Sequence, residues 1–214
     1  MAASAALEVV ASSYAAAFRL RASCTRLALS AARDVACANL MCARAGGGCA
    51  CRLAAVLDGL QGARLRQLEL ARNALPLLPA AVWRREGLVR LDASGNALQS
   101  LGLDEDVPPT QQQLAPGAQL AAPLRSSLPL PALPAPPLPP PPLPLPPPLP
   151  ELEEVDLRNN ALRAAALAPL LRDARRFPRL ARLLVNGNPA ADELRAMAAR
   201  GALSPREAAM LVLA

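Results

Sequence analysis

The chain has 214 residues, of which 53% are hydrophobic and 2% are aromatic, so it can form one or two domains around an aliphatic core. All 23 basic residues are arginine and the net charge is +6. This positive charge could reflect an acidic binding partner, but codon bias explains it equally well. The chain contains no histidine, which excludes Ser/His/Asp and Cys/His catalysis and histidine-ligated metal sites.

Residues 1–59 are predicted to form an N-terminal helical cap or a targeting segment. Helical stretches are expected around Ala5 to Leu29 and around Leu53 to Leu60. Arginines that follow the apolar stretch Val9 to Phe18, with few acids among them, resemble an organelle transit peptide rather than a secretory signal. A degenerate first coil of a repeat array is the alternative.

The cysteines all lie in the first quarter of the chain, and their odd number favours reduced intracellular thiols. They are Cys24, Cys37, Cys42, Cys49 and Cys51. The last four offer a zinc site as an alternative, but their spacing lacks paired C-x-x-C knuckles. No metal or cofactor is therefore predicted.

Residues 60–103 contain two copies of one leucine-rich motif. The copies are Leu65, Leu68, Leu70, Asn73, Leu75 and Leu88, Leu91, Ala93, Asn96, Leu98. Every position recurs after 23 residues, which predicts two coils of a repeat array. The short return after the first copy, near Val82 and Trp83, is expected to be a helical turn.

Residues 104–148 lack the motif and are predicted to be a disordered or polyproline II insertion, because proline cannot supply the N–H donors of a sheet. The sequence P-P-L-P occurs three times between Pro136 and Pro150. It resembles the ligands of WW and SH3-type domains. The alternative is a tolerated surface loop expanded by codon bias.

Residues 149–192 contain two further copies of the motif. They are Leu152, Val155, Leu157, Asn160, Leu162 and Leu180, Leu183, Val185, Asn188. The apolar stripe within Arg163 to Arg176 predicts an amphipathic helix between them.

Residues 193–214 are predicted to be a helical cap over the last coil. One helix is expected from Asp192 to Arg200, ended by Gly201. The sequence S-P-x-E then predicts a second helix, with Ser204 and Glu207 forming a capping box.

The motif L-x-x-L-x-L-x-x-N-x-L resembles that of the leucine-rich-repeat family, in its short intracellular type, over residues 60–100 and 149–192. The resemblance implies an α/β solenoid with parallel strands on a concave face, helices or turns on the convex face, and helical caps. It also implies that the repeat asparagines bond backbone groups along each turn; these are Asn73, Asn96, Asn160 and Asn188. Since one coil cannot bury its own leucines, the coils must stack.

Stacking in register predicts columns of side chains across the concave face. One column is Glu69, Asp92, Asp156 and Leu184, the next is Gln67, Arg90, Glu154 and Arg182, and Arg158 follows the third strand. Acidic side chains repel phosphate, which argues against nucleic acid on this face, and favour a basic or polar protein segment. The predicted partner-binding residues are Gln67, Glu69, Arg90, Asp92, Glu154, Asp156, Arg158 and Arg182.

The predicted function is therefore a non-catalytic, intracellular protein-binding module, with the cytoplasm the expected location and organelle import an alternative. Its carboxylates should stay ionised on an open, wet surface, which is unsuited to acid–base catalysis. The absence of an apolar run long enough for a transmembrane helix predicts no membrane span. The alternatives are a structural subunit of an axoneme or organellar ribonucleoprotein and, ranked lower, a ubiquitin-ligase substrate adaptor.

Overall fold

The computed structural model describes residues 7–10, 14–17, 24–31, 50–60, 65–103 and 148–213. These ranges belong to one compact unit, made of residues 1–103 and 146–214. Residues 104–145 form a second unit. The predictions made for the proline-rich insertion, for Cys37, Cys42 and Cys49, and for much of the N-terminal segment lie outside the described residues.

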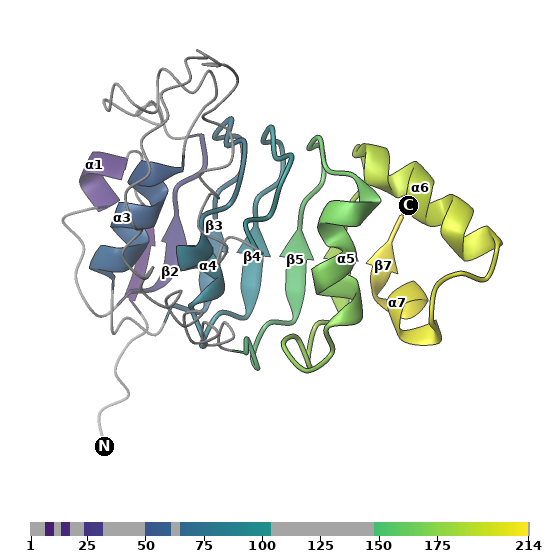
Figure 1. Cartoon of the computed structure of the whole chain (residues 1–214). Coiled ribbons are helices and arrows are strands. Elements are labelled where there is room, and N and C mark those ends of the chain that lie inside the picture. Colours follow the sequence, from purple (N-terminus) through teal and green to yellow (C-terminus); the bar gives the residue numbers. More distant parts are fainter. Residues whose placement is uncertain are drawn as a thin grey trace, which may run out of the picture. The chain divides into compact units, whose positions relative to one another are not determined.

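One parallel sheet runs through the first unit, and its strands follow chain order (Figure 1). The described strands are β1 (Leu7–Val10), β2 (Cys24–Ala28), β3 (Gln67–Glu69), β4 (Arg90–Asp92), β5 (Glu154–Asp156), β6 (Arg182–Leu184) and β7 (Leu211–Val212). Each strand pairs in parallel with the next. Parallel neighbours in this order require a return crossover after every strand. The predicted α/β solenoid of leucine-rich-repeat type is confirmed.

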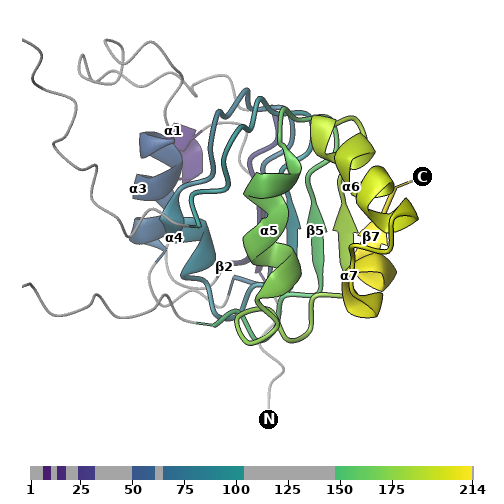
Figure 2. The same ribbon diagram turned by 45° about the vertical axis from the view of Figure 1, so that its right-hand side comes forward.

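The helices supply these returns on one face of the sheet (Figures 1 and 2). They are α1 (Tyr14–Ala17), α3 (Cys51–Gly59), α4 (Ala80–Trp83), α5 (Ala164–Arg172), α6 (Pro189–Ala199) and α7 (Pro205–Met210). The predicted helical turn at Val82 and Trp83 is α4, and the predicted amphipathic helix is α5. No helix of the described part of the chain covers the opposite face, named here the strand face.

The core lies between the sheet and the helices. The central residue of each short strand points into it, so that Leu68, Leu91, Val155 and Leu183 are paired in register and 0–1% exposed. Their neighbours on either side in the strand point to the strand face, as the two-residue period of a strand requires. The leucine-rich motif therefore specifies which face of every coil is buried.

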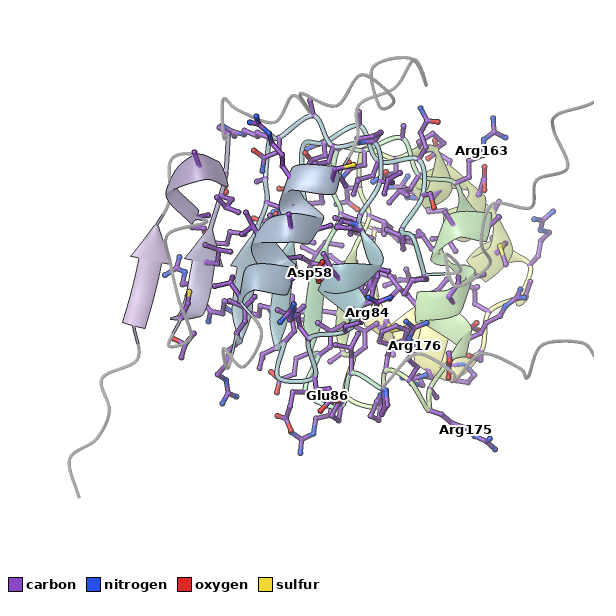
Figure 3. All side chains as sticks on the ribbon, turned by 60° about the vertical axis from the view of Figure 1, so that its left-hand side comes forward. Asp58, Arg84, Glu86, Arg163, Arg175 and Arg176 are labelled. Atoms are coloured by element: carbon purple, nitrogen blue, oxygen red, sulfur yellow. The ribbon has the colours of Figure 1, made fainter. Side chains whose placement is uncertain are left out.

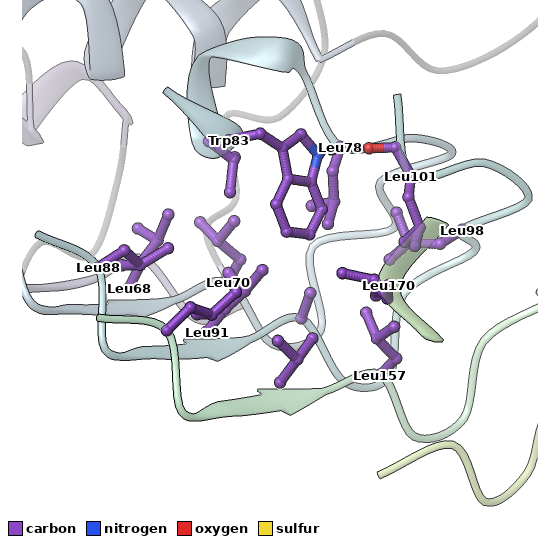
Figure 4. Packing of buried hydrophobic residues seen from close by; sticks show 14 of the residues in the cluster. Leu68, Leu70, Leu78, Trp83, Leu88, Leu91, Leu98, Leu101, Leu157 and Leu170 are labelled. Atoms are coloured by element: carbon purple, nitrogen blue, oxygen red, sulfur yellow. Dashed lines mark hydrogen bonds between the residues drawn. The ribbon is translucent and has the colours of Figure 1, made fainter. Parts of the chain in front are cut away.

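Aromatic residues fill the core between α4 and α5, where the intervening coil has no helix among its described residues. Trp83 packs edge-on against Phe177, with ring centroids 6.3 Å apart. The indole N–H of Trp83 donates a hydrogen bond of 2.6 Å to the carbonyl of Leu101 (Figure 4). These contacts join three coils. One of the contacting residues, Leu101, lies two residues before Leu103, after which the chain enters the second unit.

The repeat asparagines form a ladder of hydrogen bonds from coil to coil. The Asn160 side chain donates to the carbonyls of Ala93 at 3.0 Å and Leu157 at 2.9 Å, which belong to two successive coils. Its Oδ1 accepts the backbone N–H of Leu98 at 3.0 Å. Asn73, Asn96 and Asn188 repeat the donor pattern. The role that the family resemblance implies for these residues is thus present in the structure.

The helix expected over Ala5 to Leu29 is wrong, because β1 and β2 lie there with only the short α1 described between them. Leu27 and Leu29 are buried in the positions that Leu68 and Leu70 occupy in the next coil. The β2 coil is a degenerate copy of the motif, with Cys24 at its first apolar position. The segment expected to be helical at Leu53 to Leu60 is α3.

The C-terminal cap has the two expected helices and one additional strand. Ser204 and Glu207 form the predicted capping box of α7, and Gly201 ends the preceding segment with a φ of 67°. The chain then enters β7, which extends the sheet beyond the last motif copy. No helix among the described residues is long and apolar enough to cross a membrane.

Candidate functional site

The strand face carries two columns of side chains that the strand register aligns. The first column is Arg26, Gln67, Arg90, Glu154 and Arg182, and the second is Ala28, Glu69, Asp92, Asp156 and Leu184. All eight residues predicted for partner binding thus lie together, with Arg158 two residues beyond Asp156. Neighbouring members of a column are separated by about 4.8 Å, the strand spacing.

Arg26 joins this surface from the β2 coil, which carries no complete copy of the motif. Its guanidinium makes an ion pair of 2.7 Å with Oε1 of Glu69, and its Nε donates to the same oxygen at 2.9 Å. Only the L-x-L spacing of Leu27 and Leu29 in the sequence pointed to this coil.

Asp156 is held by the arginine that follows its strand. Nη2 of Arg158 lies 2.7 Å from Oδ2 of Asp156, and the backbone N–H of Arg158 donates to Oδ1 at 3.0 Å. The hydrogen bond with the Asp156 carboxylate raises the pKa of Arg158 above its ordinary value. Because the Asp156 side chain is only 11% exposed, this carboxylate mainly organises the surface.

Asp92 is differently placed, although it occupies the same column. Its Oδ1 accepts the backbone N–H of Ser94 at 2.9 Å. Within the described part of the chain, no arginine makes an ion pair with it. Asp92 is therefore the carboxylate of this column that is best placed to receive a positive group from another molecule.

Glu154 bridges two arginines in the first column. Its Oε2 lies 3.5 Å from Nη2 of Arg90 and 3.2 Å from Nη1 of Arg182. The arginine side chains are 57% and 60% exposed, whereas the glutamate side chain is 25% exposed. Two positive charges on the surface share one negative charge here.

The arrangement as a whole is charged but balanced. Four arginines (Arg26, Arg90, Arg158 and Arg182) face four acids (Glu69, Asp92, Glu154 and Asp156), so the formal charge of this set is zero. The surplus positive charge of the chain resides elsewhere. A neutral but polar face can select a partner by the pattern of its charges rather than by overall attraction.

Outside the strand face, the described residues offer fewer charged or reactive side chains that could form a site. Among the described residues, no cluster of three or more Cys, Asp or Glu side chains is arranged to hold a metal ion. Burial raises the pKa of the Cys24 thiol. A groove of about 410 Å³ lies on the helix side, lined by α5, α6 and the start of α7, and most of its side chains are apolar.

Compared with protein-family models and with curated proteins, the chain gives no match in either set. The fold and the strand face define its structural class, a short solenoid of leucine-rich-repeat type with a charged, uncovered sheet surface in its described part.

Proposed function

We propose that the protein is a member of the leucine-rich-repeat family and a non-catalytic interaction module that binds a protein partner on its strand face. The observation that carries this proposal is the register of the strands. It aligns charged side chains of both signs over five successive coils, on a face that no described helix covers.

The ion pairs on this face favour binding to a protein. Arg26 is already paired with Glu69, and Arg158 with Asp156, so that less side-chain entropy is lost on binding. Such ordered, mixed charge fixes the orientation of a partner through complementary contacts.

Nucleic acid is a poorer candidate for the same face. A phosphate backbone attracts surfaces with a large positive excess, whereas the charges of this set cancel. The acids at Glu69, Asp92 and Asp156 occupy consecutive coils, so any strand of nucleic acid laid along the solenoid would meet each of them in turn.

The test is a comparison of partners captured by the full-length protein and by a double variant, Arg90→Glu with Asp92→Arg. The two substitutions invert neighbouring charges on β4 and leave the net charge unchanged. Glu86→Arg with Arg175→Glu is the matched control, because both exposed side chains project from loops at the lower edge of the molecule in Figure 3, outside the two columns of the strand face. We expect the strand-face variant to lose partners that the control retains, as measured by quantitative mass spectrometry.

Identical partner profiles for the two variants would refute binding on the strand face. Sedimentation of the same samples separates an adaptor from the alternative of a structural subunit, since a subunit of an axoneme or ribonucleoprotein would travel almost wholly in a heavy particle. A further sample with residues 104–148 deleted tests our additional proposal that Pro136–Pro150 docks a WW or SH3-type domain.

A further inference from the structure

We infer that Arg90 and Arg182 form a seat for an acidic side chain, Asp or Glu, of a protein partner. This inference rests on the proposed function and specifies the chemistry of one contact within it. It adds an acidic contact at one position to the basic or polar partner segment that the sequence alone suggested for this face.

The seat is built by three neighbouring strands. Arg90 on β4 and Arg182 on β6 are both in register with Glu154 on β5. The two arginine backbones are about 10 Å apart, twice the strand spacing. Their guanidinium groups nevertheless converge on the same atom, Oε2 of Glu154, at 3.5 and 3.2 Å.

This convergence leaves donors unused. A guanidinium carries five N–H donors in a planar fork that matches a carboxylate. Within the described residues, each of these two groups makes one side-chain contact, to Glu154. Both side chains are more than half exposed, so the remaining donors face the solvent above β5.

The other ion pairs of the strand face lack this surplus. Among the described residues, Glu69 makes an ion pair with one arginine, Arg26, and Asp156 with one, Arg158, which also donates several hydrogen bonds to it. Among the described residues of the strand face, only around Glu154 do two cations share one carboxylate. Arg90, Arg182 and Glu154 together carry one net positive charge. One additional carboxylate would neutralise it, whereas a doubly charged phosphate would leave the group negative.

The surroundings also favour a carboxylate over phosphate. Asp92 and Asp156 lie in the adjacent column, on β4 and β5. The two columns are two residues apart along each strand, a distance of about 7 Å. Their charge opposes a phosphate group more strongly than a singly charged side chain. A partner segment whose acidic residue enters between the arginines would avoid both.

The experiment uses the full chain and three peptides, Ac-Ala-Ala-X-Ala-Ala-NH2, with X as Glu, phosphoserine or Arg. Each peptide is titrated while the backbone N–H resonances of β4 to β6 and the Nε–H resonances of the arginines are followed by NMR; Arg90→Gln and Arg182→Gln assign the latter, and the backbone resonances measure binding to every variant. We expect the Glu peptide to shift these two resonances in a saturable manner. The phosphoserine peptide should bind more weakly, and the Arg peptide should leave both resonances unshifted.

Two variants test the seat from opposite directions. Arg90→Gln with Arg182→Gln should weaken binding of the Glu peptide about tenfold, whereas Arg163→Gln with Arg175→Gln, the same change in charge at the two ends of α5 (Figure 3), should change it less than about twofold. Glu154→Gln removes the internal competitor and should tighten binding by up to about fivefold. A variant that merely destabilised the fold would not bind more tightly.

Equal losses in the two double variants, unsaturable shifts, or tighter binding of the phosphoserine peptide would overturn the inference. So would binding of the Arg peptide alone, abolished by Asp92→Asn; that result would leave the proposed function standing. The capture experiment with the charge-inverted β4 decides the proposed function independently.

Discussion

At the scale of single residues, the repeat asparagine is the group on which the coil-to-coil geometry depends. A carboxamide offers both donors and an acceptor, and each of these four side chains uses its donors to join carbonyls of two coils. These asparagines are buried or half-buried, so the backbone groups packed around them depend on the carboxamides for partners.

Asn160→Ala should lower the free energy of unfolding by about 1–3 kcal/mol, because it leaves the buried N–H of Leu98 without its partner. The carbonyls of Ala93 and Leu157 keep the donors of Asn96 and Asn188. Urea unfolding followed by circular dichroism measures the change. Gln99→Ala, at an exposed position next to Leu98, should cost less than about 0.5 kcal/mol. Equal effects of the two substitutions would show that the ladder contributes little to stability.

In every described coil with a repeat asparagine, the residue before that asparagine has a left-handed backbone conformation. Arg72, Gly95, Asn159 and Gly187 have φ values of 59°, 64°, 55° and 70°. Ala31, at 54°, takes the same conformation in the β2 coil. The turn therefore requires this conformation, although the residue type varies.

Gly187→Ala and Gly201→Ala separate backbone strain from crowding. Both glycines have positive φ, 70° and 67°, and a Cβ at either position costs about 1–2 kcal/mol in the left-handed region. A Cβ at Gly201 meets no atom within 4 Å, whereas one at Gly187 would collide with the Asn159 side chain. Thermal unfolding should show Gly187→Ala to be the less stable by about 1 kcal/mol or more; the reverse order would refute the crowding.

At the scale of elements, polar side chains complete the ends of helices. Nη2 of Arg85 donates to the carbonyl of Leu57 at 2.6 Å and Nη1 to that of Leu60 at 3.3 Å, at the C-terminus of α3. Burial lowers the pKa of Arg85, and the free carbonyls of a helix end favour the cation there. The contact ties α3 to the coil that contains α4.

The capping box of α7 predicts a pH dependence. Hydrogen bonds from Ser204 lower the pKa of the Glu207 carboxyl below its ordinary value of 4.5. Because the folded pKa is the lower one, the stabilisation is fully present above pH 4.5 and is lost as the pH falls through the folded value. Ser204→Ala should cost about 1 kcal/mol at pH 7 and less at pH 3, as measured by urea unfolding. A cost that does not change with pH would contradict the contribution of Glu207.

At the scale of the whole molecule, the described coils should unfold together. Each coil buries its leucines only against its neighbours, and the asparagine ladder and the Trp83–Phe177 contact connect coils that are far apart in the sequence. In such arrays, strong interfaces between repeats produce cooperative unfolding.

Trp83 is the only tryptophan of the chain, so its fluorescence reports on the coils between α4 and α5. We expect the urea midpoint from Trp83 fluorescence to coincide with that from far-UV circular dichroism, which averages over all coils. A fluorescence transition at a clearly different urea concentration would show that the coils on either side of residues 104–145 unfold independently.

The sequence by itself determined the motif-bearing coils, their register, the buried face of each strand, α4, α5 and the capping box of α7, because these follow from local spacing and from residue types with narrow conformational preferences. Only the tertiary structure decided that Cys24, Leu27 and Leu29 form another coil, since burial by a neighbour replaces the missing asparagine signal. It also decided which charged side chains of the strand face pair with one another. The pairing of Arg26 with Glu69, and the sharing of Glu154 by Arg90 and Arg182, depend on how long side chains from different coils meet, which no spacing within one coil encodes.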